Sequence, residues 1–365
     1  MVDVRLMKKQ AVISVAAGKS QVLVIEKAKK MGYAVIGIDR DPNAAGFQFC
    51  DECINLSTYE SAPVIEQLKQ LQKKYEFKGV LNRSFGIPVI TTAEICDAFH
   101  LHGVSPAAAR IVIDKSSLIS FCNENNIPAP LNVAVESLQE IRQELIKFPC
   151  VVKPALPVTG KSGVTKVERV QDLDVAFNKA KNASITGVVN IEEYIEGRDV
   201  VLMSVVNGGR VYSITLLDEV TAINDKGEFY GVGYAVPSVF TSFQEEKNIL
   251  ALAQQIVDKL RLDTSVFLMS CRCDFGRAPK LIEIHLDFGG DLVLDHLMPA
   301  SADFDVLASF VGALIGDVPE LPKNNFRPTA IIYGEGKGLV SDKPHTLIHA
   351  GTRDELDREI YRQIN

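Results

Sequence analysis

Three lysines in unusual settings are the side chains of this sequence best suited to chemistry on a charged ligand. Lys153 stands in an apolar run, 151–154, where an unpaired ammonium group would be costly to bury. Lys115 begins an expected helix, and Lys161 lies in a glycine-containing loop, 159–164. Ammonium groups and loop amides of this kind bind phosphate oxygens. Any one of these lysines is more often a solvated surface charge, so the interpretation depends on the three together.

Acidic side chains form a second group, near the end of the expected core. Glu283 stands in an apolar segment, and Asp287 follows four residues later. Asp274 closes the preceding expected strand, and Cys271 lies just before it. Mg²⁺ prefers oxygen ligands, so the thiol is a poor candidate and the carboxylates are good ones. The family resemblance described below makes Asp274, Glu283 and Asp287 the candidate metal ligands.

The segment Gly18-Lys19-Ser20 ends like a phosphate-binding Walker loop. That loop requires an earlier glycine at a position that Ile13 occupies here, inside an expected strand. A dinucleotide-binding glycine fingerprint is missing as well, because only one glycine separates the first strand from the first helix. Asp39, at the end of the second strand, is placed to meet a ribose or simply to begin a turn. We reject the Walker loop. The missing fingerprint counts against a Rossmann-type oxidoreductase or sugar-nucleotide enzyme, which stays as an alternative of another class.

The N-terminal third alternates strands and helices, which predicts a parallel sheet covered by helices in a domain spanning 1–105. Expected strands are 11–17, 33–39 and 78–84, and expected helices are 21–31, 61–75 and 88–101. A helical stretch, 105–125, leads to two prolines that mark a boundary.

Beyond the prolines the pattern changes to an α+β arrangement of mainly antiparallel strands. Gly208-Gly209 predicts a hairpin turn. We expect a small subdomain at 106–190, a larger one at 191–320 and a short C-terminal segment at 321–365. The expected strands are 150–155, 163–168, 188–195, 200–220, 265–274, 280–286, 329–334 and 345–351, with helices at 243–260 and 303–315.

Read in order, the central motifs resemble the ATP-grasp superfamily. They are most similar to carbamoyl-phosphate-synthase-large-subunit-like and biotin-carboxylase-like carboxylate–amine ligases, and the resemblance covers about residues 10–320. The motifs are Asp114-Lys115, Ile127-Pro128-Ala129-Pro130, Val151-Val152-Lys153-Pro154, Thr159-Gly160-Lys161-Ser162-Gly163, Glu192-Glu193-Tyr194-Ile195-Glu196-Gly197, Leu281-Ile282-Glu283-Ile284 and Gly289-Gly290-Asp291.

The resemblance implies an enzyme that uses ATP and Mg²⁺ to join a carboxylate to an amine through an acyl phosphate. It implies a flexible loop over the phosphates at 155–164, a strand at 192–195 that reads adenine, and an acid at the ribose. Its implied partners are ATP and small carboxylate and amine substrates. The implied nucleotide-binding residues are Lys115, Lys153, Lys161, Gly163, Glu192, Glu193, Tyr194, Ile195 and Asp199.

One corner departs from the family pattern. The family has Asn or Gly two residues after the metal-binding Glu and a catalytic Arg two further on, but here these positions hold His285 and Asp287. Asp287 could serve as an oxygen ligand, and His285 could bind a softer metal or simply form hydrogen bonds. Arg272 could replace the missing cation. The catalytic candidates are therefore Lys153, Arg272 and Asp287, and a catalytically degenerate nucleotide-binding protein remains an alternative.

Bulk properties narrow the class further. The chain has 365 residues, 47% of them hydrophobic, and a net charge of −7. That charge argues against nucleic acid as a partner, because binding phosphate backbones needs a basic surface. We see neither a run long enough to span a bilayer nor a convincing signal peptide, so we expect a cytoplasmic protein with no membrane contact. A homodimer is one of its candidate states. The seven cysteines form no paired framework.

Overall fold

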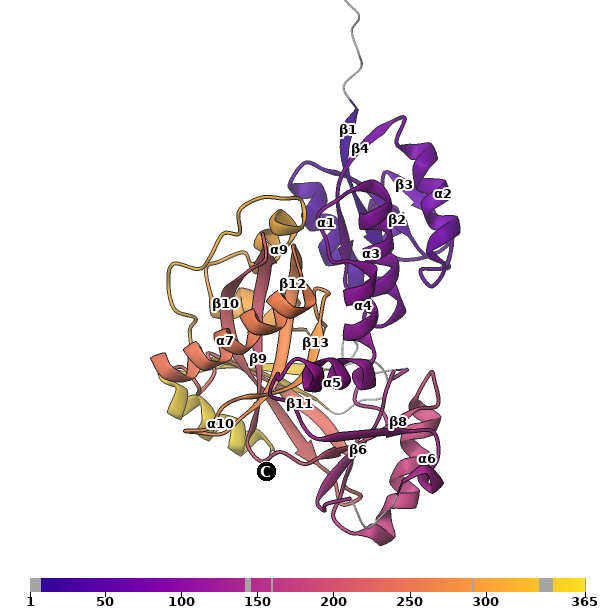
Figure 1. The fold of residues 1–365 in the computed structure, drawn as a ribbon. Coiled ribbons are helices and arrows are strands. Elements are labelled where there is room, and N and C mark those ends of the chain that lie inside the picture. The colour runs from indigo at the N-terminus through magenta and orange to yellow at the C-terminus, as the bar shows by residue number, and fades with distance from the viewer. Residues whose placement is uncertain (1–7, 142–145, 159, 291, 335–343, 365) are drawn as a thin grey trace, which may run out of the picture.

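The N-terminal domain is a four-stranded parallel sheet, as expected (Figure 1). The computed structural model describes residues 8–141, 146–158, 160–290, 292–334 and 344–364. The strand order is β3-β2-β1-β4, so β1 pairs with both β2 and β4. The strands are β1 (Lys9–Val15), β2 (Ala34–Ile38), β3 (Glu52–Ile54) and β4 (Tyr75–Asn82).

Helices cover both faces of this sheet because its strands are apolar on both sides. The residues of β2 are all buried. The helices are α1 (Val22–Lys30), α2 (Ser61–Leu71) and α3 (Ile87–Phe99). The loops after β1 and β4 lie at the carboxyl edge of the sheet, where ligands bind in α/β domains.

The expected helical stretch at 105–125 is two helices, α4 (Pro106–Ile113) and α5 (Lys115–Glu124). Asp114 interrupts it with extended backbone, and its side chain accepts a hydrogen bond from the Ser117 amide at 2.7 Å. A capping carboxylate of this kind starts a helix. Lys115 is therefore the first residue of α5, and its amide donates to the Ala155 carbonyl at 2.9 Å.

A small antiparallel sheet with strand order β5-β8-β6-β7 forms the next layer. Its strands are β5 (Asn132–Val135), β6 (Cys150–Pro154), β7 (Thr165–Val167) and β8 (Val189–Glu193). Helix α6 (Leu173–Ala183) packs on it with four buried residues at helical spacing and forms a separate core with the strands. This core is distinct from those of the N-terminal domain and of the larger sheet.

The larger sheet has seven strands in the order β13-β12-β9-β10-β11-β14-β15. Alternate residues face opposite sides: Val200 and Leu202 pack toward helix α7, whereas Val201 and Met203 face the other core. The strands are β9 (Arg198–Asn207), β10 (Arg210–Ile223), β11 (Phe229–Val236), β12 (Ser265–Cys273), β13 (Lys280–His285), β14 (Thr329–Tyr333) and β15 (His345–His349).

Helices complete the larger unit. Helix α7 (Phe243–Leu260) has the bounds expected from the sequence, and Ser242 caps its start by accepting from the Glu245 amide. A π-helical turn (Val293–Leu297) and α8 (Met298–Ser301) precede α9 (Val306–Leu314). The charged end of the chain is α10 (Arg353–Ile364). No helix in the described ranges is both long and apolar enough to cross a membrane.

The C-terminal strands belong to the larger sheet rather than to an independent unit. β14 pairs with β11, and β15 pairs with β14. The boundary near residue 320 and the other expected domain limits remain predictions. The architecture itself, a parallel α/β domain followed by two antiparallel sheets, confirms the expected fold class.

Candidate functional site

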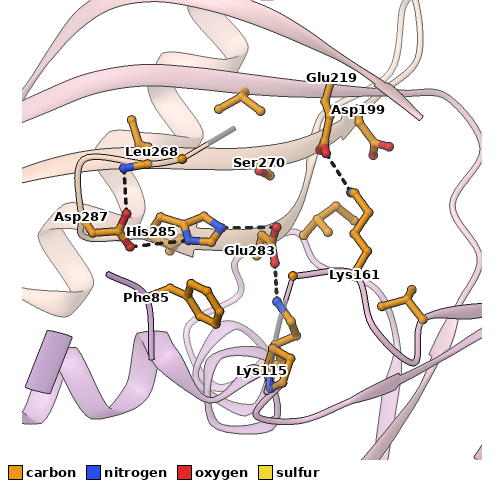
Figure 2. A pocket seen from close by; sticks show the side chains of 18 of the residues that line it. Phe85, Lys115, Lys161, Asp199, Glu219, Leu268, Ser270, Glu283, His285 and Asp287 are labelled. Atoms are coloured by element: carbon orange, nitrogen blue, oxygen red, sulfur yellow. Dashed lines mark hydrogen bonds and ion pairs between the residues drawn. The ribbon is translucent and has the colours of Figure 1, made fainter. Parts of the chain in front are cut away.

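A cavity of about 640 Å³ lies where the N-terminal domain, the small sheet and the larger sheet meet. Figure 2 shows that lysines from the surrounding elements point toward acids on the larger sheet. The expected residues Lys115, Lys153, Lys161, Glu192, Glu193, Tyr194, Ile195, Asp199, Arg272, Glu283 and Asp287 all line it. Gly163 and Asp274 are absent from its wall. Asp291 and Thr159 lie outside the described residues.

Strand pairing sets the positions of the polar groups on the cavity floor. Asp199 on β9 stands directly across from Glu219 on β10 and from Arg272 on β12. Two residues along, Ser270 on β12 stands across from Glu283 on β13. Side chains two apart in a strand share a face, so both rows point into the same cavity.

Lys153 and Glu192 form a buried ion pair beside the small sheet. The Lys153 Nζ atom lies 2.7 Å from Glu192 Oε2, and the two side chains are only 6% and 4% exposed. The other carboxylate oxygen, Oε1, is buried without a hydrogen-bond partner. Because an unsatisfied buried acceptor is costly, it is suited to accept from a ligand N–H group. The ammonium group in an apolar strand thus has a partner at the cavity wall.

Four side chains of alternating charge run along one wall: Lys115, Glu283, His285 and Asp287 (Figure 2). Lys115 pairs with Glu283. His285 Nε2 lies 3.4 Å from Glu283 Oε1, and its Nδ1 lies 3.8 Å from Asp287 Oδ2. Burial would lower the pKa of His285, but Asp287 and Glu283 outweigh it and raise the pKa to about 10. The imidazole is therefore charged at neutral pH.

The carboxylate of Glu283 is strongly held in its ionised form. Burial alone would raise its pKa, but the charge of Lys115, helped by His285 and Lys161, keeps the pKa well below its ordinary value. This is the state in which a carboxylate can bind a cation. To act as a ligand to a softer metal, His285 would have to give up this proton, because a metal-binding nitrogen must be free of its proton.

Lys161 reaches across the cavity to Glu219, with Nζ 2.9 Å from Oε1 (Figure 2). Burial raises the pKa of Glu219, and repulsion from Asp199 and Glu283 adds to this against the pull of Lys161. Burial would lower the pKa of Lys161, but the charges of Glu219, Glu283 and Asp199 outweigh it and raise that pKa. The Lys161 ammonium group therefore lies close to three carboxylates, those of Glu219, Glu283 and Asp199.

The expected adenine strand and the expected ribose acid are engaged with neighbouring side chains. Asp199 accepts from Thr221 Oγ1 at 3.0 Å and lies 3.2 Å from Arg272 Nε. Glu193 Oε2 lies 3.2 Å from Lys280 Nζ. Tyr194 lies beneath the Lys166 ammonium, 4.2 Å from its ring centre. A ribose at Asp199 would have to compete with these partners.

The metal corner needs one correction of position. Counting from Glu283 puts the earlier acid at Cys271, but Cys271 is fully buried in the core on the α7 side. Ser270, which faces the cavity, stands opposite Glu283 instead. Asp274 lies beyond the end of β12, where it pairs with Arg277. We therefore leave Asp274 out of the site.

The carboxylate oxygens of Glu283 and Asp287 are the candidate ligands that remain for Mg²⁺. No group of three or more His, Cys, Asp or Glu side chains within the described ranges is arranged for a metal. However, Asp287 Oδ2 is buried and has no hydrogen-bond partner, while Oδ1 accepts from the Gly289 amide at 2.7 Å. With Glu283, this gives two carboxylates. That fits Mg²⁺, which usually takes one or two protein carboxylates and completes its shell with phosphates and water.

Glu219 is the site residue that sequence reasoning missed. It follows Asp218 in an otherwise apolar strand, and the two acids face opposite sides of the sheet. Asp218 is bound by Ser238 and lies 2.9 Å from Arg353 Nη2. A charged pair in a 14-residue strand was the available signal. The structure also places Arg83 and Phe85, from the loop after β4, in the cavity wall.

Comparison with protein families agrees with this geometry. Residues 129–275 match the model of the D-ala D-ala ligase C-terminus. That stretch holds the small sheet, the Lys153–Glu192 pair and most of the cavity floor. The chain has the ATP-grasp fold. Solved ATP-grasp structures are similar to this chain beyond residues 129–275 as well.

Two solved structures superpose on nearly the entire chain. Phosphoribosylglycinamide synthetase from Anaerococcus prevotii has a TM-score of 0.72 at 16% identity, covering 98% of each chain. N5-carboxyaminoimidazole synthetase from Staphylococcus aureus, complexed with ADP, has a TM-score of 0.76 at 15% identity, again covering 98% of each chain. At these identities the likeness establishes the fold.

Curated relatives match over a shorter stretch. The formate-dependent phosphoribosylglycinamide formyltransferase of Nitratidesulfovibrio vulgaris (strain DP4) is 23% identical over 209 residues, 56% of this chain and 51% of the relative. That of Prochlorococcus marinus subsp. pastoris is 29% identical over 185 residues, 47% of this chain and 44% of the relative. The chain thus spans about half the length of the curated relatives it matches.

Proposed function

We propose that this ATP-grasp chain is an ATP-dependent carboxylate–amine ligase. A carboxylate oxygen of one substrate attacks the γ-phosphorus of ATP and ADP leaves. The nitrogen of an amine then attacks the acyl carbon, and phosphate leaves with its P–O bond intact. ATP-grasp relatives named as ligases and synthetases support this reading. In this proposal the carboxylate and the amine are small molecules.

The observation that carries the proposal is the convergence of three lysines on one cavity. Lys115 begins α5, Lys153 stands in β6 and Lys161 belongs to the loop before β7, yet each pairs with an acid that lines the same cavity. A triphosphate can exchange these carboxylate partners for its own oxygens. Preorganised charge of this kind is the main contribution a protein makes to phosphoryl transfer.

In this proposal the acids of the wall have separate tasks. Glu283 and Asp287 would hold Mg²⁺, which neutralises phosphate oxygens when bound. Glu192, with its unpartnered Oε1, is suited to accept from the exocyclic amino group of adenine. Arg272 lies beside Asp199, and its Nη1 donates to the Gly197 carbonyl at 3.0 Å. That position favours a role at the nucleoside end over replacement of the family's catalytic Arg.

A second candidate is a nucleotide-binding protein without ligase activity. The observation that favours it is Ser270, which offers a hydroxyl where a second strand carboxylate would stand opposite Glu283. Such a protein would bind ATP and signal its presence to a partner. The cytoplasmic location and the homodimer expected from the sequence remain predictions under both candidates.

The test is ADP formation with hydroxylamine as the amine and a panel of carboxylic acids that includes the common amino acids. Hydroxylamine converts an acyl phosphate to a stable hydroxamate, so the true amine need not be known. The ligase proposal expects Mg²⁺-dependent ADP and hydroxamate with at least one acid. Tight ATP binding without either product across the panel would favour the second candidate.

A further inference from the structure

The turn that joins β10 to β11 reaches over to the small sheet. The Lys166 amide donates to the Gly227 carbonyl at 2.7 Å, and the Phe229 amide donates to the Val164 carbonyl at 3.2 Å. Glu228 forms a bridge with Thr165 and pairs with a lysine of α6, Lys179. This hairpin tip (residues 224–228) therefore continues the edge of the small sheet. The larger sheet touches the small one through main-chain hydrogen bonds, not side chains alone.

The tip is built for this close approach. Gly227 has φ +76°, and a Cβ atom there would lie 2.4 Å from the Lys166 carbonyl oxygen. An L side chain is disfavoured by both the backbone conformation and the lack of room. Asn224 braces the turn, since its Oδ1 accepts from the amides of Lys226 at 2.9 Å and Glu228 at 3.0 Å. The turn is rigid, and only glycine fits at its point of contact.

The flap (residues 160–164) lies between this hairpin and α6. On one side Gly163 packs on α6, where an added Cβ would lie 2.8 Å from that of Ala183. On the other side Val164 is held by the β11 amide described above. Lys161, in the middle, pairs with Glu219 on β10. One hairpin therefore contacts the flap twice, by main chain at its end and by side chain at its lysine.

We propose that the hairpin tip is a positioning element for the flap and that Gly227 is its critical residue. By holding the main chain at Val164 and Lys166, the tip sets the position from which the Lys161 side chain extends. The loop that carries Lys161 is otherwise flanked by Gly160 and Gly163. Its role toward a triphosphate rests on the proposed function. Its role in holding the flap does not. Neither Gly227 nor Glu228 lines the cavity, so they act through Lys161 and not on a ligand directly.

The primary test compares Gly227→Ala with Gly208→Ala. Gly208, in the turn between β9 and β10, also has positive φ, but a Cβ there meets no atom within 4 Å. Limited trypsin digestion of the ligand-free protein, read by mass spectrometry, measures cleavage after Lys161. We expect roughly fivefold faster cleavage in Gly227→Ala, since its Cβ would overlap the Lys166 carbonyl and open the contact with the flap, and unchanged cleavage in Gly208→Ala, which shares the positive φ but has no such overlap. Equal rates in both variants would overturn the proposal.

A second variant covers the case in which Gly227→Ala does not fold. Glu228→Gln removes the charge that pairs with Lys179 and so weakens the attachment of the tip to the small sheet without adding a clash. We expect faster cleavage after Lys161 with an unchanged thermal midpoint. Wild-type cleavage in this variant, when Gly227→Ala is unfolded, would contradict the proposal.

The nucleotide readout is separate from the digestion. If the chain binds ATP, Gly227→Ala should raise the KM or Kd for ATP by roughly fivefold, equivalent to about 1 kcal/mol, with the kcat of any turnover less affected. If wild type binds no ATP, the proposed function fails, but the digestion still decides whether the tip holds the flap. Faster cleavage with unchanged ATP affinity would limit the tip to a structural role and overturn its positioning of Lys161.

Discussion

Ser270 lies directly across from Glu283 in the pairing of β12 with β13, and both face the cavity. A hydroxyl thus occupies the position from which a second strand carboxylate would meet the metal-binding Glu. The proposed Mg²⁺ site then depends on Glu283 and Asp287, with His285 between them. If Glu283 and Asp287 hold Mg²⁺ without a carboxylate at Ser270, the protein is a ligase with an altered metal site. If they do not, it has lost catalysis.

Ser270→Asp should strengthen the Mg²⁺ dependence of ATP binding. The new carboxylate would face Glu283 across the strand pair and supply a further oxygen ligand to a hard cation. We expect the Mg²⁺ concentration needed for half-maximal ATP binding to fall by roughly tenfold, about 1.4 kcal/mol. Calorimetric titrations at several Mg²⁺ concentrations measure it. Ser270→Asn, which has the same size without the charge, is the control, and equal shifts in both variants would argue against a metal at Glu283.

Lys153→Met should abolish tight ATP binding and also destabilise the protein. Removing one partner of a buried pair leaves Glu192 charged and unpaired, which costs about 3–5 kcal/mol. The double variant Lys153→Met/Glu192→Gln removes both charges and should recover much of the thermal midpoint. Calorimetry on the double variant should still find ATP affinity strongly reduced. Wild-type affinity there would show that Lys153 is a structural residue only.

ATP should bind at least tenfold more tightly than GTP, roughly 1.4 kcal/mol. Glu192 Oε1 is an acceptor suited to the amino group of adenine, whereas guanine presents a carbonyl oxygen at that position. Competition of each nucleotide against a fluorescent ATP analogue gives the ratio. Equal affinities would mean that the strand at 192–195 does not read the base.

The N-terminal domain should lose stability as the pH falls from about 4 to 2. Partial burial would raise the pKa of Asp51, but hydrogen bonds from Lys29, Lys9 and the Val35 amide lower it to about 2. Because this pKa is depressed below the value of about 3.9 for an unfolded Asp, its stabilisation is present above pH 4 and lost toward pH 2. Urea unfolding across this range measures it.

The comparison for that experiment is Asp51→Asn against Glu66→Gln. Glu66 is a largely exposed acid whose pair with Lys69 lies on the surface, where an ion pair contributes little. Asp51→Asn should flatten the pH dependence, and Glu66→Gln should leave it as in wild type. A wild-type slope in Asp51→Asn would exclude Asp51 as the titrating group.

Strong local signals made parts of the fold predictable from sequence. Helix α7 was predicted to the residue because Ser242 caps it and Glu245 follows in the first turn. Lys153 was found because an ammonium group in an apolar strand needs a partner. Helix α6 and strand β11 were missed, since neither has a comparable start signal: the α6 cap position, Asp172, makes no side-chain cap.

Irregular strand pairing hid the rest of the site. The pairing of β12 with β13 has one extra residue, Ile282, on β13. Counting back from Glu283 therefore arrives at Cys271, which points into the core, and not at Ser270, which faces the cavity. β10 has an extra residue of its own, Ile214 between Ser213 and Thr215, so an alternation counted from the start of the strand is out of phase at Glu219. A one-residue change of phase sends a side chain to the opposite face. Spacing alone therefore cannot assign these residues.

The most direct test of the account is a crystal structure of the protein with ADP and Mg²⁺. We expect the nucleotide in the cavity between the small and the larger sheets, with its base beside Glu192. The phosphates should lie within reach of Lys115, Lys153 and Lys161, and the metal should bind Glu283 and Asp287. Nucleotide bound elsewhere, or no nucleotide at saturating concentration, would contradict it.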